Sequence, residues 1–208
     1  MKHSIFPVLI SSIILTVSAW TPSEESILNN HRETIFRPDS VTLCILTTEG
    51  DTLVFADTDH LLEIDNSCAY EVISWLPQQN YWVILIIGHE WQQKLLVNGV
   101  NGRMYRTVSM PLISPDGTRL LCFNGDQVAC FDDNGIHIWR IDADSLALEF
   151  SDLDVGWEPR QMEWMSDSVI VFEKMYYYWR TYDAKYLPGR LELSSDGTWI
   201  PDDPDSWE

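Results

Sequence analysis

The sequence contains few basic residues. Lysine and arginine together number 13 against 32 aspartates and glutamates in 208 residues, which gives a formal net charge of −19 at pH 7. Nucleic acids and anionic membrane surfaces attract proteins that carry positive charge, so neither is an expected partner. Two interpretations of the acidity stay open. It either serves solubility alone, or it attracts a basic protein partner.

The motifs of common enzyme classes are also missing. The chain has no Gly-x-Ser-x-Gly elbow and no glycine-rich phosphate loop. His89 lacks the second histidine of a zinc-protease helix, and the loop at Asp57 and Asp59 lacks the glycine and distal glutamate of an EF-hand. We therefore predict no metal site, no cofactor and no enzymatic activity. Carboxylates are so numerous that spacing alone cannot identify a catalytic pair.

Long apolar runs are absent except near the first residue. A positive start at Lys2 precedes an apolar run over Ser4–Thr16 and small residues up to Ala19. This order is typical of a secretory signal peptide, so we predict cleavage after Ala19 and a signal peptide over residues 1–19. An uncleaved anchor would need a longer run to span a bilayer. The chain is thus expected to be exported, periplasmic or extracellular, without membrane insertion after cleavage.

Cysteine is scarce, with four residues and no Cys-x-x-Cys spacing. An even count in an exported chain favours two disulfides over a metal site. Cys122 and Cys130 flank the turn at 124–126 and are expected to pair, which leaves Cys44 to pair with Cys68. A register slip of one residue would place Cys122 and Cys130 on opposite faces, and buried free thiols are the alternative.

No helical stripe persists over three turns. Short apolar runs separated by turn residues instead predict an all-β chain. The clearest case is Met110–Asp142, with expected strands at Thr118–Phe123, Gln127–Phe131 and Ile136–Ile141. With a further strand upstream, this stretch would form one four-stranded meander. Tyr81–Gly88 is the most apolar run after the leader and has the length of a buried strand.

Two stretches of this meander resemble those of WD-repeat and TolB-like β-propeller blades. The turn Ser114–Gly117 resembles the serine-proline-aspartate-glycine turn of such blades, and Gly135–Ile141 resembles their third-strand ending, although Arg140 replaces the aspartate of the WD dipeptide. Similar strand ends recur around Trp75 and Trp164, at roughly the 40–50-residue period of blades. The resemblance implies a small or irregular propeller-like arrangement of about four antiparallel meander blades.

The chain divides by composition into four parts. After the signal peptide, residues 20–40 are polar and are interpreted as an arm outside the main repeat. Residues 41–200 would form one β-propeller-like domain. Residues 201–208 are acidic and proline-containing, as expected of a loose tail.

The most unusual local composition is the aromatic run at 175–182. In a strand, alternate residues share a face, so one face must enter the core and the other could be exposed. Tyrosine, tryptophan and arginine are enriched at binding hot spots. We therefore expect a binding surface, steered by acids in the preceding loop. The predicted anchors are Tyr176, Tyr178, Trp179 and Arg180, and the predicted steering acids are Asp152, Asp154 and Glu158.

These features predict an exported, non-catalytic protein-binding module that engages a cationic protein. An inhibitor or immunity-type protein that neutralises a basic enzyme is one form of this function. An exported hydrolase that acts on a sugar or peptide with carboxylates is the alternative. A cleft with two carboxyl groups about 5–10 Å apart would favour the hydrolase.

Overall fold

The fold consists almost entirely of β-structure. The computed structural model describes residues 22–58, 67–126, 132–153, 155–178 and 180–202. Within these ranges it contains fifteen strands and one short helix, α1 (Glu24–Asn30). No helix of the described ranges is long and apolar enough to cross a membrane.

The strands form four antiparallel sheets, each built from strands that are consecutive in the sequence. The first sheet contains β1 (Ile35–Phe36), β2 (Thr42–Leu46) and β3 (Thr52–Ala56). The second contains β4 (Ala69–Leu76), β5 (Tyr81–Ile87), β6 (Gln92–Asn98) and β7 (Met104–Thr107). The third contains β8 (Leu112–Ile113), β9 (Arg119–Asn124), β10 (Gly135–Ile141) and β11 (Leu146–Asp152). The fourth contains β12 (Glu158–Ser166), β13 (Val169–Tyr178), β14 (Asp183–Leu193) and β15 (Trp199–Pro201).

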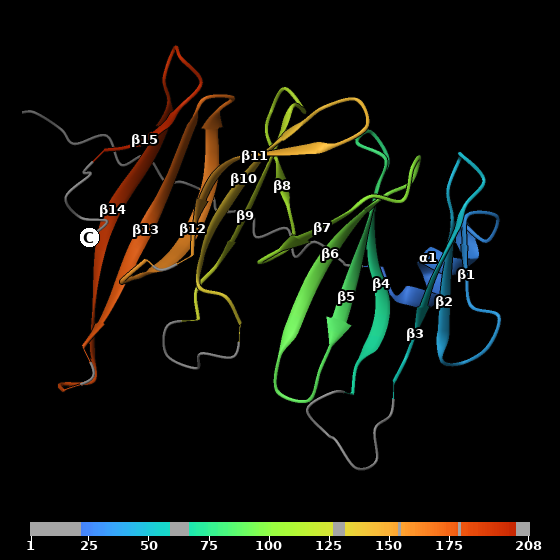
Figure 1. Cartoon of the computed structure of the whole chain (residues 1–208). Coiled ribbons are helices and arrows are strands. Elements are labelled where there is room, and N and C mark those ends of the chain that lie inside the picture. The colour runs from blue at the N-terminus through green and yellow to red at the C-terminus, as the bar shows by residue number, and fades with distance from the viewer. Residues whose placement is uncertain (1–21, 59–66, 127–131, 154, 179, 203–208) are drawn as a thin grey trace, which may run out of the picture.

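The four sheets follow one another in chain order, from the blue end to the red end of Figure 1. Each is an up-and-down meander, and its last strand leads into the first strand of the next sheet, which is the connectivity of propeller blades. The prediction of an all-β, propeller-like fold with about four blades is confirmed. The first and fourth sheets lie at opposite ends of the row (Figure 1).

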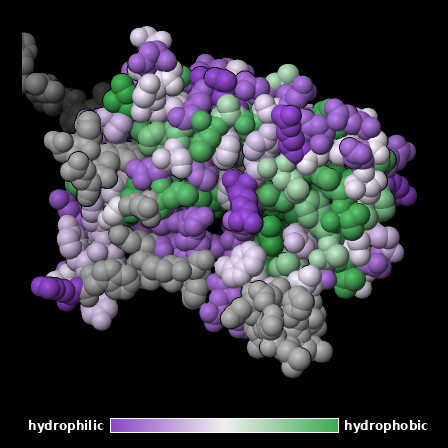
Figure 2. Space-filling view, viewed as in Figure 1, coloured by the Kyte–Doolittle hydropathy of each residue, from purple (hydrophilic) through white to green (hydrophobic). Residues whose placement is uncertain are grey.

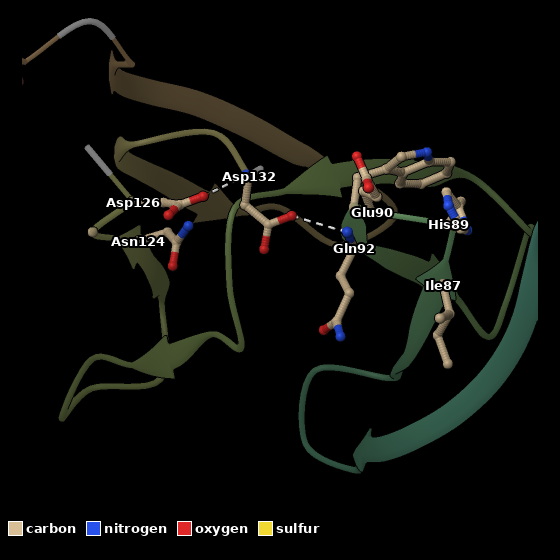
Figure 3. Close-up of a pocket in the computed structure, with 10 residues that line it drawn as sticks. Ile87, His89, Glu90, Gln92, Asn124, Asp126 and Asp132 are labelled. Atoms are coloured by element: carbon tan, nitrogen blue, oxygen red, sulfur yellow. Dashed lines mark hydrogen bonds between the residues drawn. The ribbon is translucent and has the colours of Figure 1, made fainter. Parts of the chain in front are cut away.

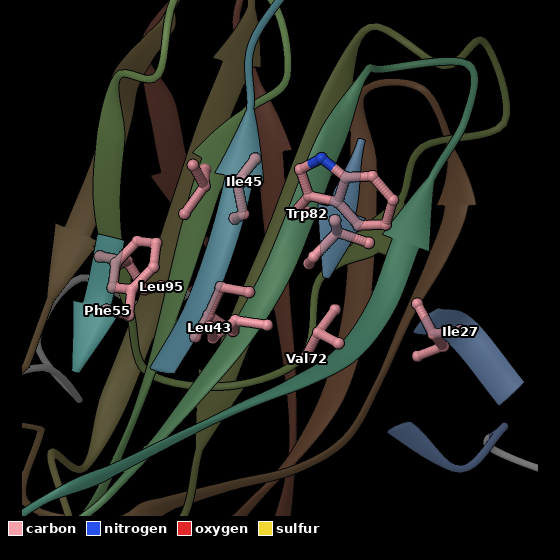
Figure 4. Packing of buried hydrophobic residues seen from close by; sticks show 10 residues of the cluster. Ile27, Leu43, Ile45, Phe55, Val72, Trp82 and Leu95 are labelled. Carbon is pink, nitrogen blue, oxygen red and sulfur yellow. The ribbon is translucent and has the colours of Figure 1, made fainter. Parts of the chain in front are cut away.

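Hydrophobic cores lie between consecutive sheets. One joins the first sheet and α1 to the second, and Figure 4 shows its side chains between β2 and β5. Another joins the second sheet to the third, and a further one joins the third to the fourth. Among the described residues, no such cluster joins the first sheet to the fourth. The row therefore has two end faces without a neighbouring sheet.

Strand β5 shows how the stacking arises from the sequence. Trp82 and Ile84 pack in the core shared with the first sheet, whereas Tyr81 and Val83 pack in the core shared with the third. All four side chains are buried. Because alternate residues of a strand point to opposite faces, a strand covered on both faces needs apolar residues throughout. The predicted buried strand is confirmed.

The three similar strand ends occupy equivalent places. Ile113 is the last residue of β8 and Trp75 the last but one of β4, each just before the turn to the second strand of its sheet, and Trp164 lies near the same turn of β12. The indole N–H of Trp164 donates to the carbonyl of Leu112, 3.1 Å away in the neighbouring sheet. The repeat in the sequence thus corresponds to a repeat of structure.

The internal pairing of Met110–Asp142 differs from the prediction. β9 pairs directly with β10, and β11 completes the sheet, so the blade extends to Asp152. The expected strand Gln127–Phe131 lies outside the described residues. The short upstream strand is β8, as expected.

The predicted disulfides are wrong, since Cys44, Cys68 and Cys122 are free thiols. The residue opposite Cys122 in the sheet is His137, because the partner of β9 is β10. Cys130 lies outside the described part of the chain.

Cys44 and Cys68 are too far apart to pair. Cys44 lies opposite Val54, whereas Cys68 forms a bridge with Thr58, four residues further along the chain. At roughly 3.3 Å per residue this is about 13 Å along the strand. A disulfide needs Cα atoms within about 7 Å.

Residues 22–40 are not a separate arm. Ile27 of α1 and Ile35 of β1 are buried in the core between the first and second sheets. Ser23 caps the helix, since its hydroxyl oxygen accepts the Ser26 backbone N–H at 3.3 Å. Although this segment is mostly polar, its two buried isoleucines attach it to the fold.

An ion pair next to α1 covers the free edge of β4. The Glu24 carboxylate accepts the Val72 backbone N–H at 3.0 Å and pairs with Arg37 at 2.9 Å. Arg37 also donates to the Tyr70 carbonyl. Backbone groups at a sheet edge need partners other than a neighbouring strand, and here two side chains supply them.

Replacement of Glu24 should weaken the fold. We expect Glu24→Ala to lower the free energy of unfolding by about 1–2 kcal/mol, because the Val72 N–H and Arg37 lose their partner. Urea denaturation would measure this change. The matched control is Glu25→Ala, which changes an exposed residue of the same helical turn. Equal effects of the two substitutions would contradict the edge-covering role.

The cysteines can be assayed directly. Denatured, unreduced protein should show at least three titratable thiols per chain. In the native protein, burial raises the pKa of Cys122 to about 12, so this thiol stays protonated and should not react at pH 8. Cys68, which is partly exposed, should react faster. Differential alkylation with mass spectrometry would distinguish them. If fewer than three thiols titrate, at least one of the predicted disulfides is present.

Candidate functional site

Hydrogen bonds between turns join neighbouring sheets at the upper edge of Figure 1. The Thr48 N–H donates to the Gly99 carbonyl at 3.0 Å, between the first and second sheets. The Asn101 amide donates to the Asp144 carbonyl at 2.8 Å, between the second and third. The Asp116 N–H donates to the Asp167 carboxylate at 2.8 Å, between the third and fourth. This edge is therefore occupied by structural contacts.

The lower edge of the row contains a hollow of about 490 Å³ between the second and third sheets. Its walls are the turn between β5 and β6 and the segments that follow β9 and precede β10 (Figure 3). The lining residues are Ile87, Gly88, His89, Glu90, Trp91, Gln92, Asn124, Gly125, Asp126 and Asp132. Figure 2 shows hydrophilic side chains across the middle of the molecule, between these two sheets.

The aromatic part of the hollow is held in place by a glycine. Trp91 is 38% exposed. A Cβ built on Gly88 would lie 2.2 Å from the Trp91 ring, so the indole rests directly on the glycine backbone. The Gly88 N–H donates to the Trp91 carbonyl at 2.8 Å and closes the turn. Glycine at 88 thus allows an exposed indole to keep one orientation.

The polar part of the hollow is acidic. Glu90 is exposed, and Asp126 and Asp132 are half-buried. The Asp132 N–H donates to Asp126 Oδ2 at 2.6 Å, and the Gln92 N–H donates to Asp132 Oδ1 at 2.9 Å (Figure 3). The second bond connects the two sheets across the hollow. Three carboxylates thus line the hollow with no lysine or arginine among its described lining residues.

A smaller hollow adjoins the first. It shares Trp91, Gln92 and Asp132 with the larger one and adds Asp133 and Arg106 at its rim. Arg106 lies on β7, opposite Leu95 of β6. The acidic surface therefore extends over Asp133 and ends at a cation.

A cysteine and a histidine lie side by side near this site. Cys122 of β9 and His137 of β10 are opposite residues on paired strands. Burial raises the pKa of the Cys122 thiol to about 12, against a hydrogen bond from Thr107 that lowers it. Burial lowers the pKa of His137, against the nearby charge of Asp133 that raises it. Both groups are therefore neutral at pH 7, the opposite of the thiolate–imidazolium pair of a cysteine nucleophile.

The predicted aromatic anchors lie elsewhere, in the fourth sheet. Tyr176 packs against the core shared with the third sheet, so it is no exposed anchor. Tyr178 is 49% exposed at the end of β13, and Arg180 is exposed in the following turn. Trp179 lies outside the described residues. Tyr182, which was not among the anchors, is 78% exposed.

Not all of the predicted steering acids are exposed to solvent. Glu158 is buried and pairs with Arg160 at 2.8 Å, so it is not a solvent-exposed charge. Asp152 is half-buried at the end of β11, and Asp154 lies outside the described residues. Glu158 nevertheless lies next to the hollow, because a Cβ built on Gly125 would be 3.0 Å from its Cβ.

Little in the sequence indicates the hollow. His89, Glu90, Trp91 and Asp132 belong to turns that are separated by some forty residues and meet only because the second and third sheets stack. No group of three or more histidine, cysteine, aspartate or glutamate side chains among the described residues is arranged to hold a metal ion.

Comparisons with known proteins give no functional assignment. No protein-family model matches the sequence, and no curated protein matches it. Among solved structures, a proposed 6-phosphogluconolactonase from Bacteroides fragilis is similar. Its sequence identity is 12%, the match covers 78% of this chain and 67% of that chain, and the TM-score is 0.29. So low a TM-score supports no argument about function.

The neutral state of His137 should make stability depend on pH. Its pKa is lower in the folded protein than the ordinary 6.5, so the unfolded chain binds this proton more readily. The stabilisation is present above pH 6.5 and is lost as the pH falls below it. We expect His137→Phe to reduce the loss of unfolding free energy between pH 7 and pH 5. Urea midpoints of both proteins at each pH would measure this, and identical losses would contradict it.

Proposed function

We propose that this protein is a non-catalytic binding module that holds a basic segment of a protein partner in the acidic hollow between its second and third sheets. The observation that supports the proposal is the combination of an oriented indole, Trp91, with the carboxylates of Glu90, Asp126 and Asp132 in one hollow. The proposal assigns the expected cationic partner to this hollow.

The chemistry of the hollow suits a lysine or arginine side chain. An ammonium or guanidinium group is attracted by the face of an indole within about 6 Å. A carboxylate beside the ring adds a charge-assisted hydrogen bond. Because the Trp91 ring rests on Gly88 and Asp132 is held by the Gln92 N–H, binding would need little reorganisation.

The charge of the whole chain supports the same partner. A net charge of −19 speeds the approach of a cationic protein and repels acidic competitors. An exported inhibitor or immunity-type protein that neutralises a basic enzyme would have these properties. Export itself is predicted by residues 1–19.

A non-catalytic role fits the polar groups near the hollow. One carboxylate oxygen each of Asp126 and Asp132 accepts a backbone N–H and so helps to hold the turns. Cys122 and His137 are both neutral and unsuited to nucleophilic attack. A carboxylate hydrolase stays the alternative, and hydrolysis of the bound peptide in the experiment below would favour it.

The binding experiment uses a synthetic peptide of alternating arginine and glycine as its probe. Calorimetry at low ionic strength should detect binding, and Glu90→Gln should weaken it by up to about fivefold, since an exposed charge pair contributes up to ~1 kcal/mol. Salt at 1 M should abolish most of the affinity, because the screening length falls to about 3 Å. An acidic peptide of equal length should not bind.

Two control variants distinguish binding in the hollow from attraction by the net charge of the protein. Glu49→Gln removes the same charge from an exposed turn at the opposite edge. Gly88→Ala should displace the Trp91 ring and weaken binding, whereas Gly156→Ala adds a methyl group in open space. Equal effects of Glu90→Gln and Glu49→Gln would show that net charge, not the hollow, binds the peptide.

A further inference from the structure

The acidic hollow has a counterpart at each of the two other junctions between sheets. A hollow of about 310 Å³, the apolar hollow, lies between the first and second sheets and includes Val41, Ala69 and Ile87 in its lining. Another of about 310 Å³, the arginine hollow, lies between the third and fourth sheets and is lined by Phe123, Gly125, Pro159, Arg160 and Gln161. The repeat of the sheets is thus accompanied by a repeat of hollows along one edge.

The three hollows adjoin one another. The apolar and acidic hollows share Ile87–His89, and the acidic and arginine hollows share Gly125. In Figure 3, Ile87 lies at one end of the acidic hollow and Asp126 at the other. A Cβ built on Gly125 would lie 3.2 Å from the Pro159 carbonyl oxygen, so a larger residue there would narrow the passage. Together the hollows form a groove at the lower edge that touches all four sheets.

The first part of the groove offers apolar contact. Val41, next to β2, is 50% exposed, and Ala69 and Ile87 on the facing strands are half-buried. The carboxylate in this hollow, Asp57, already accepts the Tyr70 backbone N–H at 2.9 Å. An apolar side chain laid against Val41 and Ile87 would lose contact with water, which favours binding.

The last part of the groove offers hydrogen-bond donors. The Arg160 side chain is 48% exposed, and its Nη2 donates to the buried Glu158 carboxylate at 2.8 Å. Within the described ranges, Arg160 Nε and Nη1 donate to no partner. A guanidinium group presents five N–H donors, so one that is held by Glu158 can still bind the carboxylate of a ligand.

A β-bulge aims these donors into the groove. Arg160 lies opposite Glu173 and Glu163 lies opposite Val171, so β12 has one more residue than β13 between these pairs. Neighbouring residues of a regular strand face opposite sides, but Arg160 and Gln161 both line the hollow. Gln161 has a φ of 51°, in the left-handed region. The bulge thus turns the strand so that both side chains face the groove.

The spacing of the sheets sets the spacing of the three hollows. Stacked sheets lie about 10 Å apart, and an extended chain advances about 3.3 Å per residue. Side chains that enter neighbouring hollows are therefore roughly three residues apart in an extended ligand. A folded ligand surface would not need to keep this spacing.

We propose that the segment bound by this protein is an extended chain that lies along the groove. Its basic residue occupies the acidic hollow, an apolar residue about three positions to one side lies against Val41 and Ile87, and an acidic residue about three positions to the other side binds Arg160. This proposal rests on the proposed function and adds an order of side chains to it. Such an order would distinguish the partner from other cationic chains.

Peptides with blocked ends test the order. The probe is leucine-glycine-glycine-arginine-glycine-glycine-glutamate, made in this direction and in the reverse direction. One of the two should bind at least about tenfold tighter than a peptide of the same composition in which leucine and glutamate directly flank arginine, because only the first pair can reach all three hollows. Calorimetry would measure the affinities.

Val41→Ser tests the apolar hollow. It should weaken binding of the better probe by about fivefold, through the loss of apolar contact with leucine. Val54→Ser is the matched control, since Val54 is similarly exposed, at 61%, in the same sheet but does not line the hollow. Equal effects of the two substitutions would contradict the assignment of leucine to this hollow.

A double-mutant cycle tests Arg160. Replacement of the glutamate of the probe by glutamine should weaken binding to the wild-type protein by up to about fivefold, and should have no effect on Arg160→Gln. The change in the peptide leaves the protein intact, so it tests the contact even if Arg160→Gln unfolds through the loss of the Glu158 partner.

The outcomes separate this inference from the proposed function. If the alternating arginine–glycine peptide binds and Glu90→Gln weakens it, but the ordered probes bind no better than the rearranged one, the order is wrong and the acidic hollow stands. If no basic peptide binds, both proposals fall. Tight binding of one ordered probe with losses at Val41→Ser and in the Arg160 cycle would support the groove.

Discussion

Burial of apolar side chains between consecutive sheets is the interaction on which the rest of the structure depends. A sheet must bury its apolar face against another element, and in this chain the neighbouring sheets supply that cover. Here each sheet covers a face of the next, and β5 provides the clearest case with Tyr81 and Trp82 on opposite sides. The hydrogen bonds between turns at the upper edge then hold an arrangement that burial has already selected.

The position of the acidic hollow follows from this stacking. The turn at Gly88–Trp91 belongs to the second sheet, and Asp126 and Asp132 belong to the third. Stacking brings them to one edge, and the bond from the Gln92 N–H to Asp132 sets their spacing. A site at a junction between sheets also explains why its residues need not be close in sequence.

The free edge of β4 and the two end faces of the row carry different kinds of side chain. At the free edge of β4, within the row, the Glu24–Arg37 pair takes the place of a neighbouring strand. The end face of the fourth sheet bears the exposed Glu163 and the Arg190–Glu192 ion pair beside the exposed Ile200. The end face of the first sheet is uncharged and bears exposed Phe36 and Val54, so the two ends present different surfaces to the solution.

The sequence by itself determined the β-character of the chain, the four-meander repeat and the buried strand β5, because these depend on local periodicity and turn chemistry. Trp75, Ile113 and Trp164 indicated the repeat through strand ends of similar composition. Only the tertiary structure decided that Cys122 lies opposite His137, that Ile27 and Ile35 enter the core, and that Glu158 is buried against Gly125. Those outcomes depend on which strands pair and which sheets stack. Such contacts join residues far apart in the chain, and no local pattern encodes them.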